Sequence, residues 1–218
     1  MARSAAPARL QSPTRDTITG IVLAGGRGSR MGGIDKGLVP WHGRPLARHA
    51  LERLAPQVRA SAISANRHAP TYASWGVAVW PDTLTGFHGP LAGLLTAMVQ
   101  ARTTWVCTVP CDSPRFPADL VARLTRAATE NAAPLALAAT RDASGRLQAE
   151  PAFCLAHVGL RIALEQFLLG GGRRVREWAE SEGAVLVPFD LSHDDPQAFA
   201  NANTAADLAN LASLSDAR

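Results

Sequence analysis

The chain has 218 residues, enough for one domain with a full-sized hydrophobic core, and 47% of them are hydrophobic. No apolar run approaches the roughly 18–20 residues of a membrane span, so we expect no membrane partner. The formal net charge is +4, but the arginines are scattered and no basic run with interleaved aromatic residues occurs. This distribution argues against a nucleic-acid partner and is compatible with a small phosphorylated ligand.

Neither the cysteines nor the N-terminal segment indicates a functional site. The three cysteines, Cys107, Cys111 and Cys154, are odd in number and lack a second ligand cluster, so neither disulfides nor a zinc site are predicted. We expect buried thiols in a reducing cytoplasm. Residues 1–17 lack the continuous apolar stretch of a signal peptide, and we interpret them as a disordered extension.

Apolar β-type runs alternate with helical patterns, which predicts an α/β fold with a mostly parallel sheet. Gly89-Pro90 marks a helix start, because the first helical turn does not need the N–H that proline lacks. In chain order, the first half is predicted to contain strand 18–23, helix 45–54, strand 58–65, strand 76–80, helix 89–101 and strand 104–109.

The second half continues the alternation, with two recognisable helix ends. Gly170-Gly171-Gly172 is a C-cap signal, and Thr204 with Asp207 is a variant of the capping box. We expect residues 18–218 to form a single domain, with a nucleotide-binding half at 18–112 and an acceptor-binding half at 113–213. The elements predicted here are helix 118–129, strand 134–140, turn 141–146, extended chain 147–155, helix 158–169, a helical segment 173–181 and strand 184–187.

Small or polar residues directly follow four consecutive predicted strands. Gly25 and Gly26 follow the first strand, Asn66 the second, Asp82 the third and Asp112 the fourth. In open α/β sheets, ligands bind beyond the carboxyl ends of the strands. We therefore expect these residues to form one site, although Asp82 beside Pro81 is also a common turn residue and Asp112 could serve as a capping carboxylate.

A glycine-rich loop follows the first strand and ends at Lys36, the only lysine among the 22 Lys and Arg residues. A P-loop needs a Ser or Thr directly after its lysine, and Gly37 stands there instead. A dinucleotide fingerprint needs two residues before its last glycine, whereas three separate Gly28 from Gly32. Spacing therefore argues against both common glycine loops.

The remaining interpretation is a longer loop that suits a triphosphate. Its backbone amides and Arg30 would hold phosphate oxygens, and Lys36 would neutralise charge on the phosphoryl group under attack. A lysine ammonium is a compact point charge that can approach phosphate oxygens where a planar guanidinium does not fit. The alternative is a plain glycine turn with basic residues by chance.

These motifs resemble those of a known family. Leu23-Ala24-Gly25-Gly26, then Arg30-Met31-Gly32, then Lys36 resembles the opening signature of nucleotidyltransferases that join an NTP to a phosphorylated acceptor. The later blocks are more specific, and together they resemble the molybdenum cofactor guanylyltransferases from residue 18 to the last helix. These blocks are residues 64–68, 81–82, 89–93, 109–114, 172–175 and 201–204.

The resemblance implies a fold, a reaction and a nucleotide site. The fold would be a three-layer Rossmann-like α/β sandwich of the nucleotide-diphospho-sugar transferase type. Arg30, Lys36 and Asp112 would be catalytic, and Asp112 would hold Mg²⁺, which prefers one or two carboxylates plus phosphate oxygens and water. The implied GTP-binding residues are Leu23, Ala24, Gly25, Gly26, Lys36, Asn66, Asp82 and Asp112.

The implied acceptor is Mo-molybdopterin, whose terminal phosphate would receive GMP from GTP without a protein nucleophile. We place four residues on the molybdopterin side: Arg173, Arg174, Asn201 and Asn203. Arginine forks suit phosphates and polar pterin edges, although the arginine pair could be a solvated helix start and Asn203 a helix N-cap. We expect a monomer with transient contacts to proteins that deliver molybdopterin or accept the finished cofactor.

Three other functions remain open from the sequence. A cytidylyltransferase acting on the same cofactor and a sugar-phosphate nucleotidyltransferase would share the loop through Lys36. A non-catalytic carrier of GTP or pterin would not require Asp112 as a metal carboxylate, and the presence of both Lys36 and Asp112 argues against it.

Overall fold

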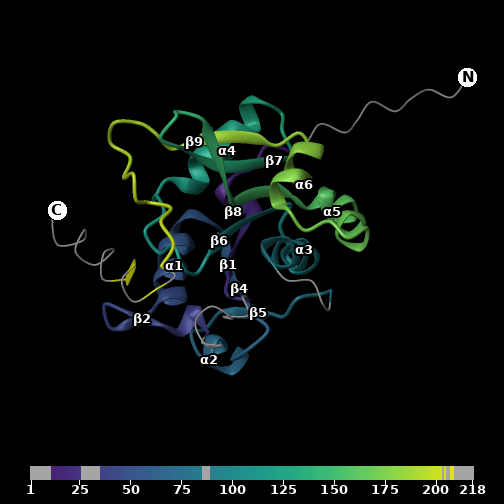
Figure 1. Ribbon diagram of the computed structural model, residues 1–218. Coiled ribbons are helices and arrows are strands. Elements are labelled where there is room, and N and C mark those ends of the chain that lie inside the picture. The colour runs from purple at the N-terminus through teal and green to yellow at the C-terminus, as the bar shows by residue number, and fades with distance from the viewer. Residues whose placement is uncertain (1–10, 26–34, 85–88, 203, 205–206, 209–218) are drawn as a thin grey trace, which may run out of the picture.

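The computed structural model describes residues 11–25, 35–84, 89–202, 204 and 207–208, and these build one seven-stranded sheet with helices on both faces (Figure 1). Only β8 runs antiparallel to its neighbours, so the expected mostly parallel sheet is confirmed. The strands, in spatial order, are β5 (Ala78–Trp80), β4 (Ala60–Ser64), β1 (Ile18–Leu23), β6 (Trp105–Pro110), β8 (Leu147–His157), β7 (Leu135–Arg141) and β9 (Val185–Pro188).

The carboxyl ends of the neighbouring parallel strands lie level with one another. Leu23 at the end of β1 pairs with Ser64 on one side and with Pro110 on the other. Ser64 in turn pairs with Trp80 at the end of β5. β1 lies between β4 and β6 and is almost wholly buried, in keeping with its mostly apolar sequence. Residues that come directly after these four strands therefore meet at one edge of the sheet.

Helices cover both faces of the sheet, as the three-layer prediction requires (Figure 1). One face carries α1 (Leu46–Leu54) and α4 (Leu120–Glu130), and the other carries α3 (Pro90–Gln100), α5 (Arg161–Leu169) and α6 (Val175–Ser181). α4 buries one stripe of side chains, as expected for a surface helix. α3 is buried on nearly all sides because it lies between the sheet and α5.

Several short elements were not predicted, because each has too few residues to show a periodic pattern. The two-residue strands β2 (Pro40–Trp41) and β3 (Arg44–Pro45) form a hairpin whose turn uses positive φ angles at His42 and Gly43. The others are α2 (Ala69–Ala73) and the 3₁₀ helices η1 (Arg15–Thr17), η3 (Lys36–Leu38) and η4 (Ala55–Gln57). The 3₁₀ helix η5 (Val158–Leu160) forms the start of the predicted helix 158–169, which continues as α5.

The predicted disordered extension is wrong for residues 11–17, which are ordered against the sheet. Trp105 Nε1 donates a hydrogen bond to the Gln11 carbonyl (3.0 Å), and Arg15 Nε donates to the Pro56 carbonyl (3.0 Å). The prediction missed this because these contacts join positions far apart in the chain. Residues 1–10 lie outside the described part.

The C-cap predicted at residues 170–172 is confirmed, and the hydrogen bonds of the predicted capping box at Thr204 are present; the closing helix itself lies largely outside the described residues. Gly171 adopts a positive φ of 91° at the end of α5, and its N–H donates to the Leu168 carbonyl. Thr204 and Asp207 exchange two hydrogen bonds between side chain and backbone, as in a capping box. None of the helices in the described ranges has both the length and the apolar character needed to cross a membrane.

Candidate active site

Backbone pairing continues one residue past the strand ends and holds the start of each connecting loop. Ala24 N–H donates to the Ser64 carbonyl (2.8 Å), Ala65 N–H to the Trp80 carbonyl (3.1 Å), and Cys111 N–H to the Leu23 carbonyl (3.1 Å). Ala24, Ala65 and Cys111 directly precede the predicted site residues Gly25, Asn66 and Asp112. The rigid sheet therefore positions three of the expected residues at one edge.

A cavity of about 160 Å³ opens at this edge, between the strand ends and the first turns of α3. An added Cβ at Gly93 would lie 2.5 Å from Leu23 Cδ2 and 3.1 Å from Ser64 Oγ, so any larger residue would force the Leu23 side chain to move. The cavity lining includes three predicted ligand residues, Leu23, Gly25 and Asp82. The full lining comprises Leu23, Gly25, Ser64, Asp82, Gly89, Pro90, Gly93, Pro110 and Ala152.

Asn66 and Asp82 hold each other at the rim of this cavity. Asn66 Nδ2 donates to Asp82 Oδ2 (2.8 Å), and the Asp82 N–H donates to Asn66 Oδ1 (2.8 Å). The Asn66 amide thus joins the carboxylate of Asp82 to the backbone of the same residue and helps to orient the carboxylate. A carboxylate accepts hydrogen bonds only, so the pair can present an acceptor to adjacent N–H donors of a planar ligand.

Lys36 and Asp112 meet although 76 residues separate them in the chain. Lys36 Nζ lies 3.1 Å from Asp112 Oδ2, and the two side chains are 24% and 19% exposed. η3 carries the lysine, and the loop after β6 carries the aspartate, whose carbonyl accepts a hydrogen bond from Ala202 N–H (2.7 Å). The pair is accessible enough to contact a ligand and sheltered enough for its charges to act strongly.

The donor set around Asp112 fits a metal that arrives with its ligand. Asp112 uses Oδ2 for Lys36, and its Oδ1 has no hydrogen-bond partner among the described residues. In the described part of the chain, no group of three His, Cys, Asp or Glu residues is arranged to hold a metal ion. One carboxylate completed by phosphate oxygens and water is the coordination that Mg²⁺ accepts.

Of the residues predicted on the acceptor side, Asn201 lies beside Asp112. Its Oδ1 is 2.6 Å from the hydroxyl of Ser113, a fully buried residue that comes directly after Asp112 in the chain. Arg173 donates to the Leu168 and Gly172 carbonyls at the end of α5, a capping role that the sequence did not predict. The Arg174 side chain is exposed and makes no hydrogen bond or ion pair with another described residue.

Three predicted site residues, Gly26, Arg30 and Asn203, lie outside the described residues. The predictions for them remain predictions.

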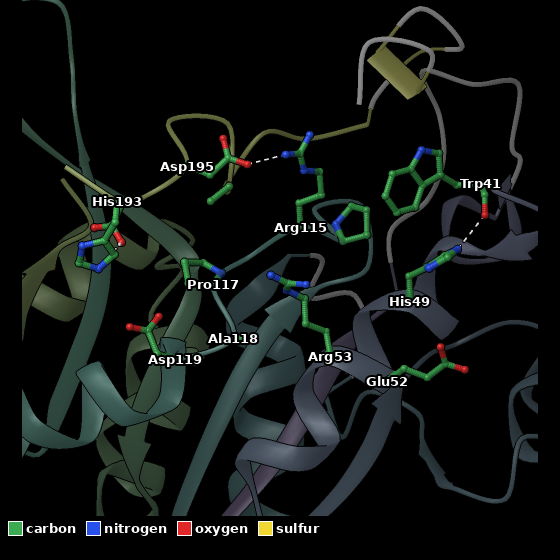
Figure 2. Close-up of a pocket in the computed structure, with 13 residues that line it drawn as sticks. Trp41, His49, Glu52, Arg53, Arg115, Pro117, Ala118, Asp119, His193 and Asp195 are labelled. Carbon is green, nitrogen blue, oxygen red and sulfur yellow. Dashed lines mark hydrogen bonds and ion pairs between the residues drawn. The ribbon is translucent and has the colours of Figure 1, made fainter. Parts of the chain in front are cut away.

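A larger cavity of about 790 Å³ lies between α1, residues 114–119 and residues 193–198 (Figure 2). Burial lowers the pKa of Arg53 in its wall, and the nearby charge of Arg115 lowers it further. Arg115 is itself paired with Asp195 at 2.5 Å. The ionised lining residues are Glu52, Arg53, Arg115, Asp119, Asp194 and Asp195. Carboxylates outnumber guanidinium groups among them, so this cavity is a poor place for a triphosphate.

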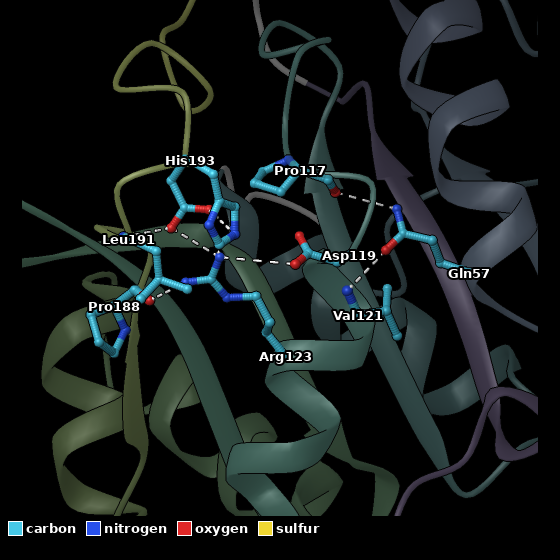
Figure 3. A network of polar contacts seen from close by, with 9 residues as sticks. Gln57, Pro117, Asp119, Val121, Arg123, Pro188, Leu191 and His193 are labelled. Carbon is cyan, nitrogen blue, oxygen red and sulfur yellow. Dashed lines mark hydrogen bonds and ion pairs between the residues drawn. The ribbon is translucent and has the colours of Figure 1, made fainter.

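Polar contacts join residues 188–194, at and after the end of β9, to Arg123 on α4 (Figure 3). Arg123 Nη1 donates to Asp194 Oδ1 (2.7 Å), and Nη2 donates to the Pro188 carbonyl (2.6 Å). The guanidinium also lies 3.8 Å from the centre of the Phe189 ring. The same segment continues along the chain to Ala202, whose N–H donates to the Asp112 carbonyl.

Sequence reasoning missed a buried contact next to Lys36. Tyr72 Oη donates to Asp35 Oδ1 (2.8 Å), and Asp35 is only 6% exposed. The two residues are 37 positions apart, and no motif spacing or periodicity relates one to the other. No local signal could have predicted the pairing.

The fold and the site together define a nucleotidyltransferase, and comparisons with known proteins agree. The family model for the MobA-like NTP transferase domain matches residues 20–185. A molybdenum cofactor guanylyltransferase of Acidovorax sp. (strain JS42) is 52% identical over 202 residues, covering 90% of this chain and 96% of the relative. The corresponding protein of Cupriavidus necator is 51% identical over 194 residues, covering 89% of this chain and 96% of the relative.

Solved structures show the same fold. Molybdopterin-guanine dinucleotide biosynthesis protein A from Archaeoglobus fulgidus superposes with a TM-score of 0.74 at 21% identity, covering 92% of this chain and all of that one. The 4-diphosphocytidyl-2C-methyl-D-erythritol synthase of Anaerococcus prevotii gives 0.67 at 11% identity, covering 93% of this chain and all of that one. The chain belongs to the MobA-like NTP transferase family, with the molybdenum cofactor guanylyltransferases as its relatives.

Proposed function

We propose that the protein transfers GMP from GTP to the terminal phosphate of Mo-molybdopterin, giving molybdopterin guanine dinucleotide cofactor and pyrophosphate. The observation that carries the proposal is the Lys36–Asp112 pair at 3.1 Å, beside a cavity lined by Leu23, Gly25 and Asp82. The names of relatives about half identical over about nine-tenths of the chain support the same reaction.

In this mechanism an oxygen of the acceptor phosphate attacks the α-phosphorus of GTP in line. The new P–O bond forms as the bond to the β-phosphate breaks, and pyrophosphate leaves with the electron pair. Lys36 donates to the non-bridging oxygens of the transferring group, where negative charge develops. Asp112 would hold Mg²⁺, which would supply further charge neutralisation there. No protein nucleophile is required.

The remaining residues of the site divide between the two substrates. The Asn66–Asp82 pair would accept hydrogen bonds from the guanine edge or the ribose, while Ala24, Gly25 and the predicted Gly26 and Arg30 would contact the nucleotide and its phosphates. Asn201 beside Asp112 supports an acceptor on that side. Arg173, Arg174 and Asn203 remain proposed molybdopterin contacts.

The domain organisation, the cellular compartment and the oligomeric state are also proposals. Both halves of the chain contribute strands to one sheet, which supports a single domain with a nucleotide half and an acceptor half. The three buried thiols suit a reducing cytoplasm. We propose that the protein acts as a monomer and contacts the proteins that deliver molybdopterin or accept the product only transiently.

Pyrophosphate release on mixing GTP, Mg²⁺ and Mo-molybdopterin tests the reaction. Lys36→Ala and Asp112→Ala should each lower kcat/KM by about 100-fold or more, as for loss of a group that stabilises transition-state charge. Glu130→Gln, in an exposed ion pair on α4, is the matched control and should be unchanged. Full transfer by both site variants would refute the assignment. Faster turnover with CTP in a competition assay would identify a cytidylyltransferase, and binding without turnover would identify a carrier.

A further inference from the structure

We propose that Asp35 and Tyr72 form a positioning pair that aims Lys36 at the phosphoryl group being transferred. This inference rests on the proposed function of Lys36. Neither residue contacts the lysine ammonium directly. They act through the backbone turn that carries Lys36, because Asp35 bonds the Gly37 N–H and Tyr72 bonds Asp35.

The turn at Lys36 is anchored on both sides. Asp35 precedes the lysine, and its Oδ1 accepts a hydrogen bond from the N–H of Gly37, the residue after the lysine (3.1 Å). The same oxygen accepts the Tyr72 hydroxyl at 2.8 Å. Lys36 therefore lies between two residues tied to one carboxylate oxygen, and its side chain leaves the turn in a defined direction, toward Asp112.

The Asp35 carboxylate is buried, and one of its two oxygens lacks a hydrogen-bond partner among the described residues. It is 6% exposed, it forms no ion pair with a described residue, and its Oδ2 is buried without a hydrogen-bond partner among the described residues. Its hydrogen-bond donors among the described residues are the Gly37 N–H and the Tyr72 hydroxyl, and a buried polar oxygen that lacks a hydrogen bond costs free energy. A strained or costly local arrangement beside a reacting group is the pattern expected of a functional element.

Tyr72 connects this turn to the nucleotide side of the site. It is fully buried on α2, in edge-to-face contact with Trp75 at 5.1 Å, and α2 begins three residues after Asn66. An added Cβ at Gly37 would lie 2.3 Å from Tyr72 Oη, so the hydroxyl touches the turn itself. Burial, and then the hydrogen bond to Asp35, raise the pKa of Tyr72 far above its usual value, so the phenol remains a donor.

The single lysine of this chain makes the proposal directly measurable. In protein labelled with ¹³C-lysine, Lys36 is the one labelled residue, and its Cε resonance reports the surroundings of the ammonium without an activity assay. Tyr72→Phe removes only the hydroxyl, and Asp35→Asn keeps an oxygen acceptor while removing the charge. Ser74→Ala is the matched control, because it removes a hydroxyl hydrogen bond at the end of the same helix and does not involve the turn.

We expect Tyr72→Phe and Asp35→Asn to shift the Lys36 resonance in the direction produced by Asp112→Asn, and Ser74→Ala to leave it in place. We expect kcat for GMP transfer to fall about 10-fold to 100-fold, as for a misplaced catalytic group, with the KM for GTP little changed. In a Lys36→Ala background, Tyr72→Phe should cause no further loss, because its effect passes through the lysine.

An unmoved resonance in both Tyr72→Phe and Asp35→Asn would overturn the proposal, as would an equal loss of kcat with and without Lys36. The two hypotheses fail separately. If the unmodified protein transfers no GMP, the proposed function is wrong, and a shifted resonance still supports the positioning pair.

Discussion

Replacing Arg123 with methionine should destabilise the protein by about 3 kcal/mol, because it removes one partner of a largely buried ion pair. The Arg123 and Asp194 side chains are 16% and 8% exposed. Methionine fills similar volume but leaves the Asp194 charge uncompensated, and the Pro188 carbonyl and the Phe189 ring lose their contacts with the guanidinium. For a chain of this length the expected fall in Tm is about 6–12 °C.

The effect should depend on pH in a defined direction. Burial acts to raise the pKa of Asp194, but hydrogen bonds from Arg123 and from the Leu191 N–H, with the Arg123 charge, lower it below its ordinary 3.8. A carboxyl whose folded pKa is depressed contributes its full stabilisation above its unfolded pKa and loses it as the pH falls through the folded pKa. The Tm difference should therefore be largest near pH 7 and shrink below pH 3.8.

Calorimetry of the unmodified protein, Arg123→Met and the control Arg126→Met measures this effect. Arg126 is on the same helix, but its side chain is 79% exposed and its partner Glu130 is 58% exposed, so its replacement should leave Tm unchanged. Equal losses in the two variants, or a loss for Arg123→Met that persists undiminished at low pH, would refute the reasoning.

Three further outcomes are expected at the site and in the core. Asn66→Ala should raise the Kd for GTP about 10-fold in calorimetry, because Asp82 loses the two hydrogen bonds that it makes with Asn66, and an unchanged Kd would contradict the role of the pair. Gly93→Ala and Gly20→Ala both crowd a neighbouring leucine, and each should lower the free energy of unfolding by about 1–3 kcal/mol. Only Gly93→Ala should also weaken GTP binding, because Gly93 lines the cavity and Gly20 does not. The three cysteine thiols, whose burial raises their pKa values, should react with a disulfide reagent at pH 8 only after denaturation; rapid reaction of the native protein would show that they are accessible.

Local patterns in the sequence determined the type and approximate position of most elements. The apolar run ending at Leu23 and the Gly89-Pro90 helix start both lie where they were predicted, within a residue or two. The rule that ligands gather at strand ends also placed Asp82 and Gly25 in one site, and both line the same cavity. These features depend on residues close in sequence, so the sequence alone carries them.

The tertiary structure decided which strands are neighbours and which side chains meet. β8 lies between β6 and β7 in antiparallel orientation, an order that its sequence does not encode locally. Lys36 meets Asp112 across 76 residues, and Tyr72 meets Asp35 across 37. Such pairings result from packing the whole sheet against two helical layers, which brings distant segments together at distances that local periodicity does not contain. The sequence by itself thus determined the elements and the edge of the sheet where the candidate site lies, and tertiary packing determined the partner and direction of each candidate side chain.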